Sequence, residues 1–312
     1  TVLPMLNRRH FLKQAALATG SLIAAPYLQA APLATTRRLT ILHTNDTHSR
    51  IDPFPMDGGR NQGLGGVARP AHLIKQIQSE QEAVILLDAG DIFQGTPYFN
   101  FYNGKPEIKA MTSMGYDAAT IGNHDFDAGI ENLALQLKRH AAFPMIVSNY
   151  DFSGNAMESI YQPYKIIKKG GLQIGLLGVG IELDGLVPEN LIGGTKYLSP
   201  IEKANEVAAI LKKKKCDLII CLSHLGYSYN YNKVSDLVLA KESQNIDVII
   251  GGHTHSFLEK PTIVKNKSGE DVVINQVGFA GIILGRLDFV FEEKKQKKLV
   301  DSASLLVSKK SD

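Results

Sequence analysis

Short runs of apolar residues alternate with longer stretches in which apolar residues recur every three or four positions. The first pattern is typical of a strand buried on both faces, and the second of a helix with one buried face. The predicted strands are Leu39–Thr44, Val84–Leu87, Ala118–Ile121, Met145–Ser148, Tyr164–Ile167, Leu172–Val179, Leu218–Leu222 and Val248–Ile250. The predicted helices are Gly66–Gln78, Pro106–Met114, Ile130–Arg139, Ile201–Lys215 and Val234–Ala240. This alternation predicts an α/β fold.

The C-terminal part of the sequence has a different pattern, because two apolar segments follow each other with no helical stretch between them. Val272–Asn275 and Leu284–Phe291 are predicted to be antiparallel strands. No repeat, low-complexity linker or apolar run of membrane-spanning length divides the sequence after residue 38. We therefore expect a single domain at residues 38–292, built as two packed mixed β-sheets flanked by helices, an αββα sandwich. Residues 293–312 are expected to form a hairpin or tail.

The first 34 residues have the layout of an export signal. Arg8, Arg9 and Lys13 precede a stretch of small apolar residues at Ala15–Ala25, and the paired arginines followed by Phe-Leu-Lys resemble a twin-arginine signal. The alternative is a cytosolic amphipathic helix. The signal interpretation predicts a periplasmic or otherwise exported protein that has no membrane attachment once residues 1–34 are removed.

The charge balance bears on nucleic-acid binding, and the cysteine positions bear on disulfide formation. The net charge of +3 comes from the three basic residues of the N-terminal segment. The rest of the chain has 31 basic and 31 acidic residues. This balance provides no basic field for binding nucleic acid. Cys216 and Cys221 flank a predicted strand that would hold them roughly 16 Å apart, so we expect free, buried thiols.

Polar residues follow the predicted strands at five places. In open α/β sheets the residues that form the site lie just past the carboxyl ends of the strands. Five of the nine histidines of the chain fall in these motifs, so we expect the motifs to meet in one site. The motifs are Asp46-Thr47-His48, Gly90-Asp91, Gly122-Asn123-His124-Asp125, Ser223-His224 and Gly252-His253-Thr254-His255.

The donor types in these motifs indicate a metal site. In an extended backbone, residues two apart point the same way, so the pairs Asp46/His48 and His253/His255 are each expected to converge on one ion. The glycines in and beside the motifs would let the backbone approach that centre without a clashing Cβ. Carboxylate, amide and imidazole donors suit divalent Zn, Mn or Fe, and the lack of cysteine ligands argues against a closed structural zinc site. The number of donors fits two ions, with Asp91 as the bridging carboxylate.

In their order, the five motifs resemble those of the calcineurin-type metallophosphoesterases, and within them the N-terminal catalytic domain of the bacterial 5'-nucleotidase and UDP-sugar hydrolase family. The resemblance covers Thr40 to about Phe291. It implies the metallophosphatase sandwich fold and two divalent metal ions. It also implies that the first ion is held by Asp46, His48, Asp91 and His255, and the second by Asp91, Asn123, His224 and His253.

The same resemblance implies a reaction. His124, oriented by Asp127, resembles the family's histidine and carboxylate pair beside the phosphate, where it would stabilise charge on the phosphoryl group and the leaving oxygen. Two cations lower the pKa of bound water toward about 7, so the attacking group would be a metal-bound hydroxide. We expect Asp125 to support the loop. The expected substrates are phosphate monoesters, above all nucleoside 5'-monophosphates. The alternatives are a 2',3'-cyclic-nucleotide phosphodiesterase, a UDP-sugar hydrolase, or a non-catalytic nucleotide-binding subunit of a two-chain assembly.

The sequence departs from the family pattern in two ways. Residues 293–312 are too few for the C-terminal domain that clamps the nucleotide base in full-length members. The expectation is therefore a standalone phosphatase, a catalytic half completed by a separate chain with that domain, or a piece of a longer protein. Ser49 and Arg50 replace the glycine usual after the Asp-x-His pair. Arg50 either contacts a phosphate, along with Asn123 and His124, or packs as a loop residue. The aromatic segment Gln94–Tyr102 either stacks on a leaving group or covers the next helix.

Overall fold

Strand β1 (Arg37–Thr44) shows why the predicted strands are apolar on both faces. Leu39 and Ile41 of this strand pack into one hydrophobic core, and Leu42 packs into a second core on the opposite face. Side chains alternate between the faces of a strand, so a strand covered on both sides needs apolar residues throughout. The computed structural model describes residues 36–292 and 297–307, and the expected signal segment 1–34 lies outside them.

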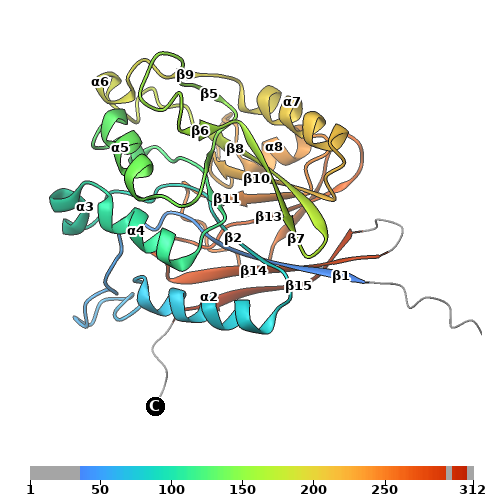
Figure 1. Cartoon of the computed structure of the whole chain (residues 1–312), viewed down its shortest axis with the longest axis horizontal. Helices are drawn as coiled ribbons and strands as arrows, with labels where there is room; N and C mark the ends of the chain where they lie inside the picture. Colours follow the sequence, from blue (N-terminus) through green and yellow to red (C-terminus); the bar gives the residue numbers. More distant parts are fainter. Residues whose placement is uncertain (1–35, 293–296, 308–312) are drawn as a thin grey trace, which may run out of the picture. The chain divides into compact units, whose positions relative to one another are not determined.

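Two mixed sheets make up the fold (Figure 1). The first has seven strands. At one edge β14 runs antiparallel to both of its neighbours, β15 and β1, while β1 and the four strands beyond it are parallel to one another. Its strand order is β15 (Lys297–Leu306), β14 (Ile283–Phe291), β1, β2 (Val84–Asp88), β3 (Ala118–Ala119), β4 (Met145–Ile146) and β6 (Tyr161–Gln162).

The second sheet has six strands. Its four central strands run parallel, and the strand at each edge runs antiparallel to its neighbour. A separate two-stranded sheet pairs β5 (Tyr150–Asp151) with β9 (Lys196–Tyr197). The order of the six strands is β12 (Thr262–Lys265), β13 (Asp271–Asn275), β11 (Val248–Gly251), β10 (Leu218–His224), β8 (Leu172–Gly180) and β7 (Tyr164–Lys169).

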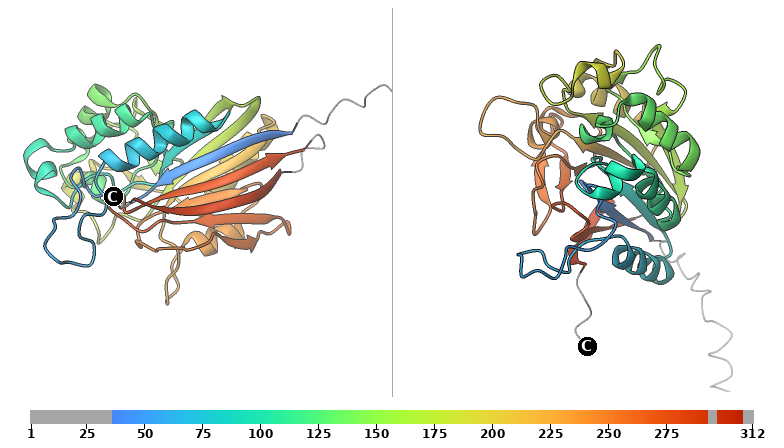
Figure 2. Two further views of the ribbon diagram at one scale, coloured as in Figure 1. Left: turned by 90° about the horizontal axis from the view of Figure 1, so that it is seen from below. Right: turned by 90° about the vertical axis from the view of Figure 1, so that its left-hand side faces the viewer.

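Helices cover the outer faces of the two sheets, as Figure 2 shows from two directions. One core lies between the sheets, a second beneath α2, α4 and α5, and a third beneath α7 and α8. This arrangement confirms the predicted α/β fold with two mixed sheets flanked by helices. The helices are α2 (Ala68–Glu80), α3 (Pro97–Tyr102), α4 (Lys105–Met114), α5 (Ile130–His140), α6 (Glu189–Ile192), α7 (Pro200–Lys213) and α8 (Asp236–Glu242), with a 3₁₀ turn at His124–Phe126.

The C-terminal part of the fold differs from expectation. The segment Val272–Asn275 lies in β13, which runs parallel to β11 and antiparallel only to β12, while Leu284–Phe291 lies in β14 of the other sheet. Beyond residue 292, β15 pairs antiparallel with β14 along its length, which agrees with the hairpin expected there and adds an edge strand to this sheet. Strand β12 was not predicted, since only two of its four residues are apolar and their pattern is too short to stand out.

The expectation of free thiols is met, and that of buried thiols is met by Cys221 only. Cys216 and Cys221 are both free, with Cys221 buried and Cys216 partly exposed. Among the residues that the structure describes, no helix combines the length and the hydropathy needed to cross a membrane.

Candidate metal centre

The predicted site residues lie just beyond the carboxyl ends of five strands. In the seven-stranded sheet β1, β2 and β3 end in register, with Thr44 beside Asp88 and Asp88 beside Ala119. In the other sheet β10 and β11 end together, with Ser223 beside Gly251. The motifs that follow these strands therefore meet at one edge of the sandwich.

The backbone at this edge is not extended, so the reason for expecting each pair to converge is wrong, although Asp46 and His48 do share one donor cluster. Asp46, His48, His253 and His255 have positive φ angles of 50°, 47°, 74° and 51°. Left-handed backbone is uncommon outside glycine and concentrates at functional sites. Here it lets the N–H groups of Asp46 and His48 donate to carbonyl groups of the loop after β2. With this backbone, His253 and His255 lie in different donor clusters.

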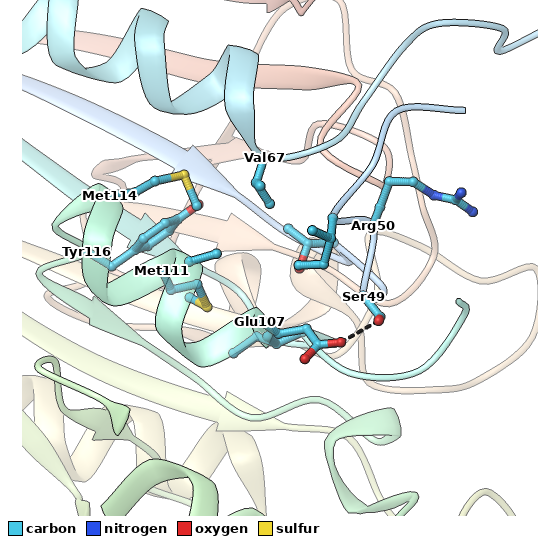
Figure 3. A pocket seen from close by; sticks show the side chains of 11 residues that line it. Ser49, Arg50, Val67, Glu107, Met111, Met114 and Tyr116 are labelled. Carbon is cyan, nitrogen blue, oxygen red and sulfur yellow. Dashed lines mark hydrogen bonds between the residues drawn. The ribbon is translucent and has the colours of Figure 1, made fainter. Parts of the chain in front are cut away.

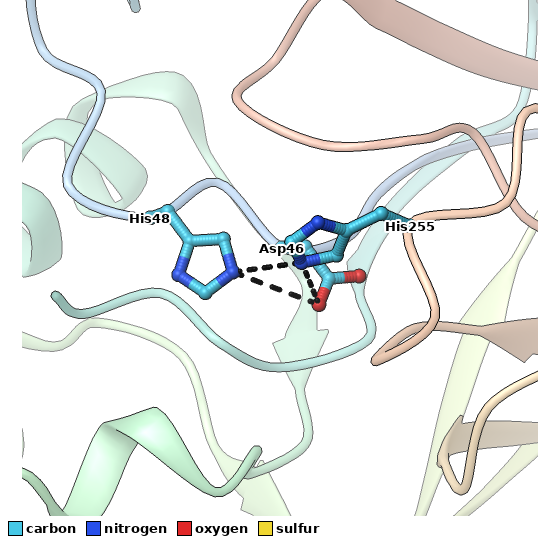
Figure 4. A group of neighbouring side chains, drawn as sticks. All are labelled: Asp46, His48 and His255. Carbon is cyan, nitrogen blue, oxygen red and sulfur yellow. Dashed lines mark hydrogen bonds and ion pairs between the residues drawn. The ribbon is translucent and has the colours of Figure 1, made fainter. Parts of the chain in front are cut away.

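The first donor cluster consists of Asp46, His48 and His255, whose ligand atoms lie within 4.8 Å of one another (Figure 4). Nε2 of His48 is 3.0 Å from Nε2 of His255. Oδ1 of Asp46 is 3.4 Å from Nε2 of His255 and 3.9 Å from Nε2 of His48. Burial lowers the pKa of His48, which favours the neutral imidazole that ligates metals. Two imidazole nitrogens and a buried carboxylate that converge in this way suit a shared cation.

The second cluster consists of Asp91, His224 and His253. Oδ2 of Asp91 lies 3.1 Å from Nε2 of His224. Asn123 adjoins this cluster, because its Oδ1 is 2.9 Å from Nδ1 of His253. Burial, together with the charge of His224, lowers the pKa of His253 to about 4. The neutral imidazole is again the form that ligates a metal.

His224 shows whether a cation fits this cluster. Its Nδ1 lies 2.7 Å from the carbonyl oxygen of Ala89 and donates to it, so Nε2 of the neutral imidazole carries a lone pair. Nε2 is buried without a hydrogen-bond partner and faces the Asp91 carboxylate. Burial by itself lowers the pKa of His224, but Asp91 outweighs it and raises that pKa to about 10. The raised pKa means that a positive charge is favoured between Nε2 and the Asp91 carboxylate, which a proton supplies in the metal-free protein. The donor set fits a divalent ion in the same place.

Asp91 lies between the two clusters. Its Oδ2 is 3.1 Å from His224 of the second cluster and 3.8 Å from Nε2 of His48 of the first. Its Oδ1 accepts a hydrogen bond of 2.8 Å from the backbone N–H of His124. Burial raises the pKa of Asp91, but the neighbouring histidines, His224 first, hold it below its usual range. Asp91 is therefore an ionised carboxylate within reach of both clusters.

His124 and Asp127 form a pair at the mouth of this site. Nδ1 of His124 is 2.9 Å from Oδ2 of Asp127, and 39% of the His124 side chain is exposed. The hydrogen bond to Asp127 raises the pKa of His124, against the opposing effect of burial. Since Nδ1 donates to Asp127, Nε2 of His124 is left for a group in the site. The His124 ring packs 5.3 Å from the His48 ring of the first cluster.

Two glycines show how closely the backbone approaches the donors. A Cβ at Gly122 would lie 2.1 Å from Oδ1 of Asp91, and one at Gly252 would lie 2.8 Å from Nδ1 of His224. No side chain fits at such separations, so both positions require glycine. The expectation that the motif glycines permit close approach is confirmed.

Asp125 holds together the loops that carry Asp91 and Asn123. Its two carboxylate oxygens accept hydrogen bonds from four backbone N–H groups, those of Asp91, Ile92, Phe93 and Gly122. This geometry confirms that Asp125 supports the loop. Burial, and then the charge of Asp91, raises the pKa of Asp125 to about 7.

Sequence reasoning missed two amides that fix the first cluster. Asn45 donates to Oδ2 of Asp46 over 2.6 Å and to the carbonyl of Gly278. Gln276 accepts a 2.6 Å hydrogen bond from the N–H of Ser256, next to His255. Asn45 directly precedes a motif, a signal that was available in the sequence, whereas Gln276 lies at the end of β13 and nothing in the sequence connects it to the site.

Arg50 belongs to neither donor cluster. Its guanidinium carbon lies over the ring of Phe54, 4.0 Å from the ring centroid. It lines a cavity of about 300 Å³ whose wall includes His48, His124 and His255. Of the segment 94–102, Gln94 and Gly95 line this cavity, and the aromatic residues after them form α3 outside it.

A smaller cavity of about 30 Å³ lies behind the first cluster (Figure 3). Glu107 of α4 is buried there and accepts a hydrogen bond from the hydroxyl of Ser49, the residue after His48. The other carboxylate oxygen of Glu107 is buried without a partner among the described residues. Burial raises the pKa of Glu107.

This fold and this arrangement of donors define a class of metal-dependent phosphoester hydrolases. The sequence profile of the calcineurin-like phosphoesterase family matches residues 39–257. The chain belongs to that family.

Its relatives in sequence include 5'-nucleotidases. The chain is 34% identical over 275 residues to the snake venom 5'-nucleotidase of Gloydius brevicauda, a match that covers 82% of this chain and 46% of that protein. It is 34% identical over 289 residues to the 5'-nucleotidase of Rattus norvegicus, covering 84% and 48%. The chain thus spans about half the length of these relatives.

Solved structures agree with the sequence relatives. The 5'-nucleotidase precursor from Thermus thermophilus superposes with a TM-score of 0.77 at 32% identity, covering 86% of this chain and 54% of that one. The calcineurin-like phosphoesterase YfkN from Bacillus subtilis superposes with a TM-score of 0.71 at 25% identity, covering 87% and 91%.

Proposed function

We propose that this protein is an exported dinuclear-metal phosphoesterase that hydrolyses phosphate monoesters, above all nucleoside 5'-monophosphates. The observation that carries the proposal is the pair of Asp/His clusters with Asp91 within 3.8 Å of both. Two clusters that share one ionised carboxylate are the donor arrangement expected of a two-metal site.

In this proposal the first ion is held by Asp46, His48, Asp91 and His255, and the second by Asp91, Asn123, His224 and His253. Zn, Mn and Fe match these donors. When bound, the two ions neutralise phosphoryl oxygens and activate a water molecule near neutral pH.

His124 and Asp127 act on the phosphate in this scheme. Asp127 accepts a hydrogen bond from Nδ1 over 2.9 Å and raises the pKa of His124, which favours the imidazolium form. In that form Nε2, the nitrogen that faces the phosphate in this scheme, carries a second proton. This N–H donates to the phosphoryl group and to the leaving oxygen as negative charge builds there. The contribution is largest in the transition state, because that is where the charge is greatest. Asn123, at the adjoining cluster, places its amide beside the same phosphate.

The substrate assignment is supported by the relatives, which are named 5'-nucleotidases. Since these proteins are about twice as long, a second domain or a separate chain that carries such a domain is part of the proposal for nucleotide selection. The export assignment is supported by the twin-arginine pattern of residues 1–34 and by relatives named as venom proteins.

The test combines metal analysis with a substrate panel. Purified protein loaded with Mn or Zn is assayed on AMP, UDP-glucose, 2',3'-cyclic AMP and p-nitrophenyl phosphate, with and without EDTA. We expect about two ions per chain and turnover of AMP that EDTA abolishes. Preferred turnover of UDP-glucose or of the cyclic nucleotide would move the assignment to those reactions. Tightly bound metal without turnover of any ester would instead indicate a nucleotide-binding subunit.

A further inference from the structure

The cavity beside the candidate metal centre carries a cation that the metal chemistry does not use. Arg50 lines it together with Phe54, Phe279, Gln94 and the site histidines His48, His124 and His255. Its volume of about 300 Å³ is at the lower end of the range for small-molecule sites. Arg50 thus shares one cavity with three histidines of the candidate site.

The guanidinium group of Arg50 packs on the ring of Phe54. The guanidinium carbon is 4.0 Å from the centroid of the Phe54 ring. A guanidinium packed on an aromatic face keeps its N–H groups available around its edge, where they match the two oxygens of a carboxylate or phosphate. Phe54 therefore fixes the orientation of Arg50 without consuming its hydrogen-bond donors.

The donors of Arg50 lack an anionic partner. Within the described ranges 36–292 and 297–307, no ion pair of 4.0 Å or less joins Arg50 to a carboxylate, and its buried Nε has no hydrogen-bond partner. The charge of Asp52 acts on Arg50, but the two side chains form no ion pair, and the Asp52 carboxylate accepts a 2.7 Å hydrogen bond from the hydroxyl of Tyr98. In Figure 3 the Arg50 side chain points away from Glu107, so that buried acid does not neutralise it either.

A row of aromatic contacts connects Arg50 to the first donor cluster. Phe279 stacks on His255 with ring centroids 5.1 Å apart, and Phe54 meets the edge of Phe279 at 6.3 Å. Arg50 lies over Phe54. Arg50 thus ends a row of ring contacts that starts at the first donor cluster, and a leaving group that lies along this row would meet the guanidinium.

We propose that Arg50, oriented by Phe54, is the anion-binding element of a leaving-group subsite, and that phosphate esters with a second oxyanion, a phosphate or a carboxylate, are a further class of substrate. The inference rests on the proposed phosphoesterase function and adds a substrate class to it. It also assigns Phe279 as the apolar wall against which the leaving group packs.

The test uses two substrates that differ by one carboxylate, phenyl phosphate and 4-carboxyphenyl phosphate. Arg50→Met keeps an unbranched stem over Phe54 and removes the charge. Arg60→Met, at an exposed position of the loop that follows, is the matched control for loss of one positive charge. The kcat/KM of each substrate is measured for the three proteins with the same metal.

A charged hydrogen bond lost from the leaving group costs about tenfold to a hundredfold in kcat/KM. Arg50→Met is therefore expected to lower kcat/KM for 4-carboxyphenyl phosphate by at least that much relative to phenyl phosphate, while Arg60→Met changes both alike. Equal losses on both substrates in Arg50→Met would overturn the proposal, because they place Arg50 on the reacting phosphate or in loop stability. A second pair of substrates, ADP and AMP, tells whether the second oxyanion is a phosphate. If Arg50→Met lowers kcat/KM for ADP more than for AMP, the oxyanion is a phosphate. If the selective loss occurs only for 4-carboxyphenyl phosphate, it is a carboxylate.

Failure of the proposed function is distinguishable from failure of the subsite. If the wild-type protein does not hydrolyse phenyl phosphate with any metal, the phosphoesterase proposal fails. The subsite is then tested by titrating metal-free protein with 4-hydroxybenzoate and with phenol, followed by NMR. Binding of 4-hydroxybenzoate that exceeds that of phenol, and that Arg50→Met weakens at least tenfold, supports the anion site. Equal binding of the two compounds contradicts it.

Discussion

Oδ2 of Asp91 lies 3.1 Å from Nε2 of His224, a nitrogen that is buried and has no hydrogen-bond partner among the described residues. The same oxygen lies 3.8 Å from Nε2 of His48. One carboxylate atom thus connects two clusters of donors whose other members come from different strands. The predictions on metal content and turnover follow from this relationship.

Asp91→Ala is expected to remove bound metal from both clusters, because each loses its shared anionic donor. Metal content per chain is measured by mass spectrometry after dialysis against metal-free buffer. Asp52→Ala, which removes an exposed carboxylate outside the clusters, is the control and is expected to retain the wild-type content. An Asp91→Ala protein that still holds two ions would contradict the bridging role.

His124→Ala is expected to retain metal and lose turnover. His124 lies outside both clusters, and loss of a group that stabilises developing charge costs about a hundredfold to a thousandfold in kcat. Asp127→Asn keeps the imidazole but removes the carboxylate that orients it, so its kcat should lie between those of the wild type and of His124→Ala. Metal loss in His124→Ala equal to that in Asp91→Ala would show that the division between ligand and catalytic residue is wrong.

Asp125→Asn is expected to destabilise the fold. The amide group of asparagine replaces one carboxylate oxygen, and two of the four backbone N–H groups then face a donor instead of an acceptor. Leaving two buried N–H groups unsatisfied costs about 2 to 5 kcal/mol. Urea unfolding measures the change, with Asp184→Asn at an exposed position as the control. A change below about 1 kcal/mol would mean that the loop re-forms its hydrogen bonds elsewhere.

Glu107→Gln tests the buried carboxyl behind the first cluster. Burial raises its pKa in the folded protein, so the folded state binds this proton more tightly than the unfolded chain, where glutamate titrates near about 4.3. The contribution of Glu107 to stability is therefore complete at low pH and falls as pH rises, until it levels off above the raised pKa. Glutamine does not titrate.

The stability of Glu107→Gln relative to wild type is accordingly expected to increase with pH from about 4 upward. Unfolding free energies of the metal-free proteins are compared between pH 4 and 8, and Glu82→Gln at an exposed position is the reference profile. A difference that stays constant over this range would show that the Glu107 proton does not contribute.

The course of the chain was largely predictable from its hydrophobic pattern. The strands that carry the site, such as Val84–Asp88 and Leu218–His224, are short apolar runs, and the structure has them within a few residues of their expected limits. Periodicity reports burial on one or both faces, which is a local property. Strand β12 and the pairing of β13 were not predictable, because a short edge strand has little periodicity and its partner is chosen by contacts distant in sequence.

The sequence by itself determined which donor types exist and that they follow the strands at one edge of a sheet. It also determined the need for glycine at positions such as Gly122, where a side chain would strike a neighbouring carboxylate. Only the tertiary structure decided which donor belongs to which of the two clusters. His253 and His255 are two residues apart, yet left-handed backbone at both sends them to different clusters. The partnership of Arg50 with Phe54, near Phe279 from the other end of the chain, was likewise decided by packing. The physical reason is that sequence spacing specifies direction only for regular backbone, whereas at a strand end the hydrogen bonds of neighbouring loops set each dihedral angle.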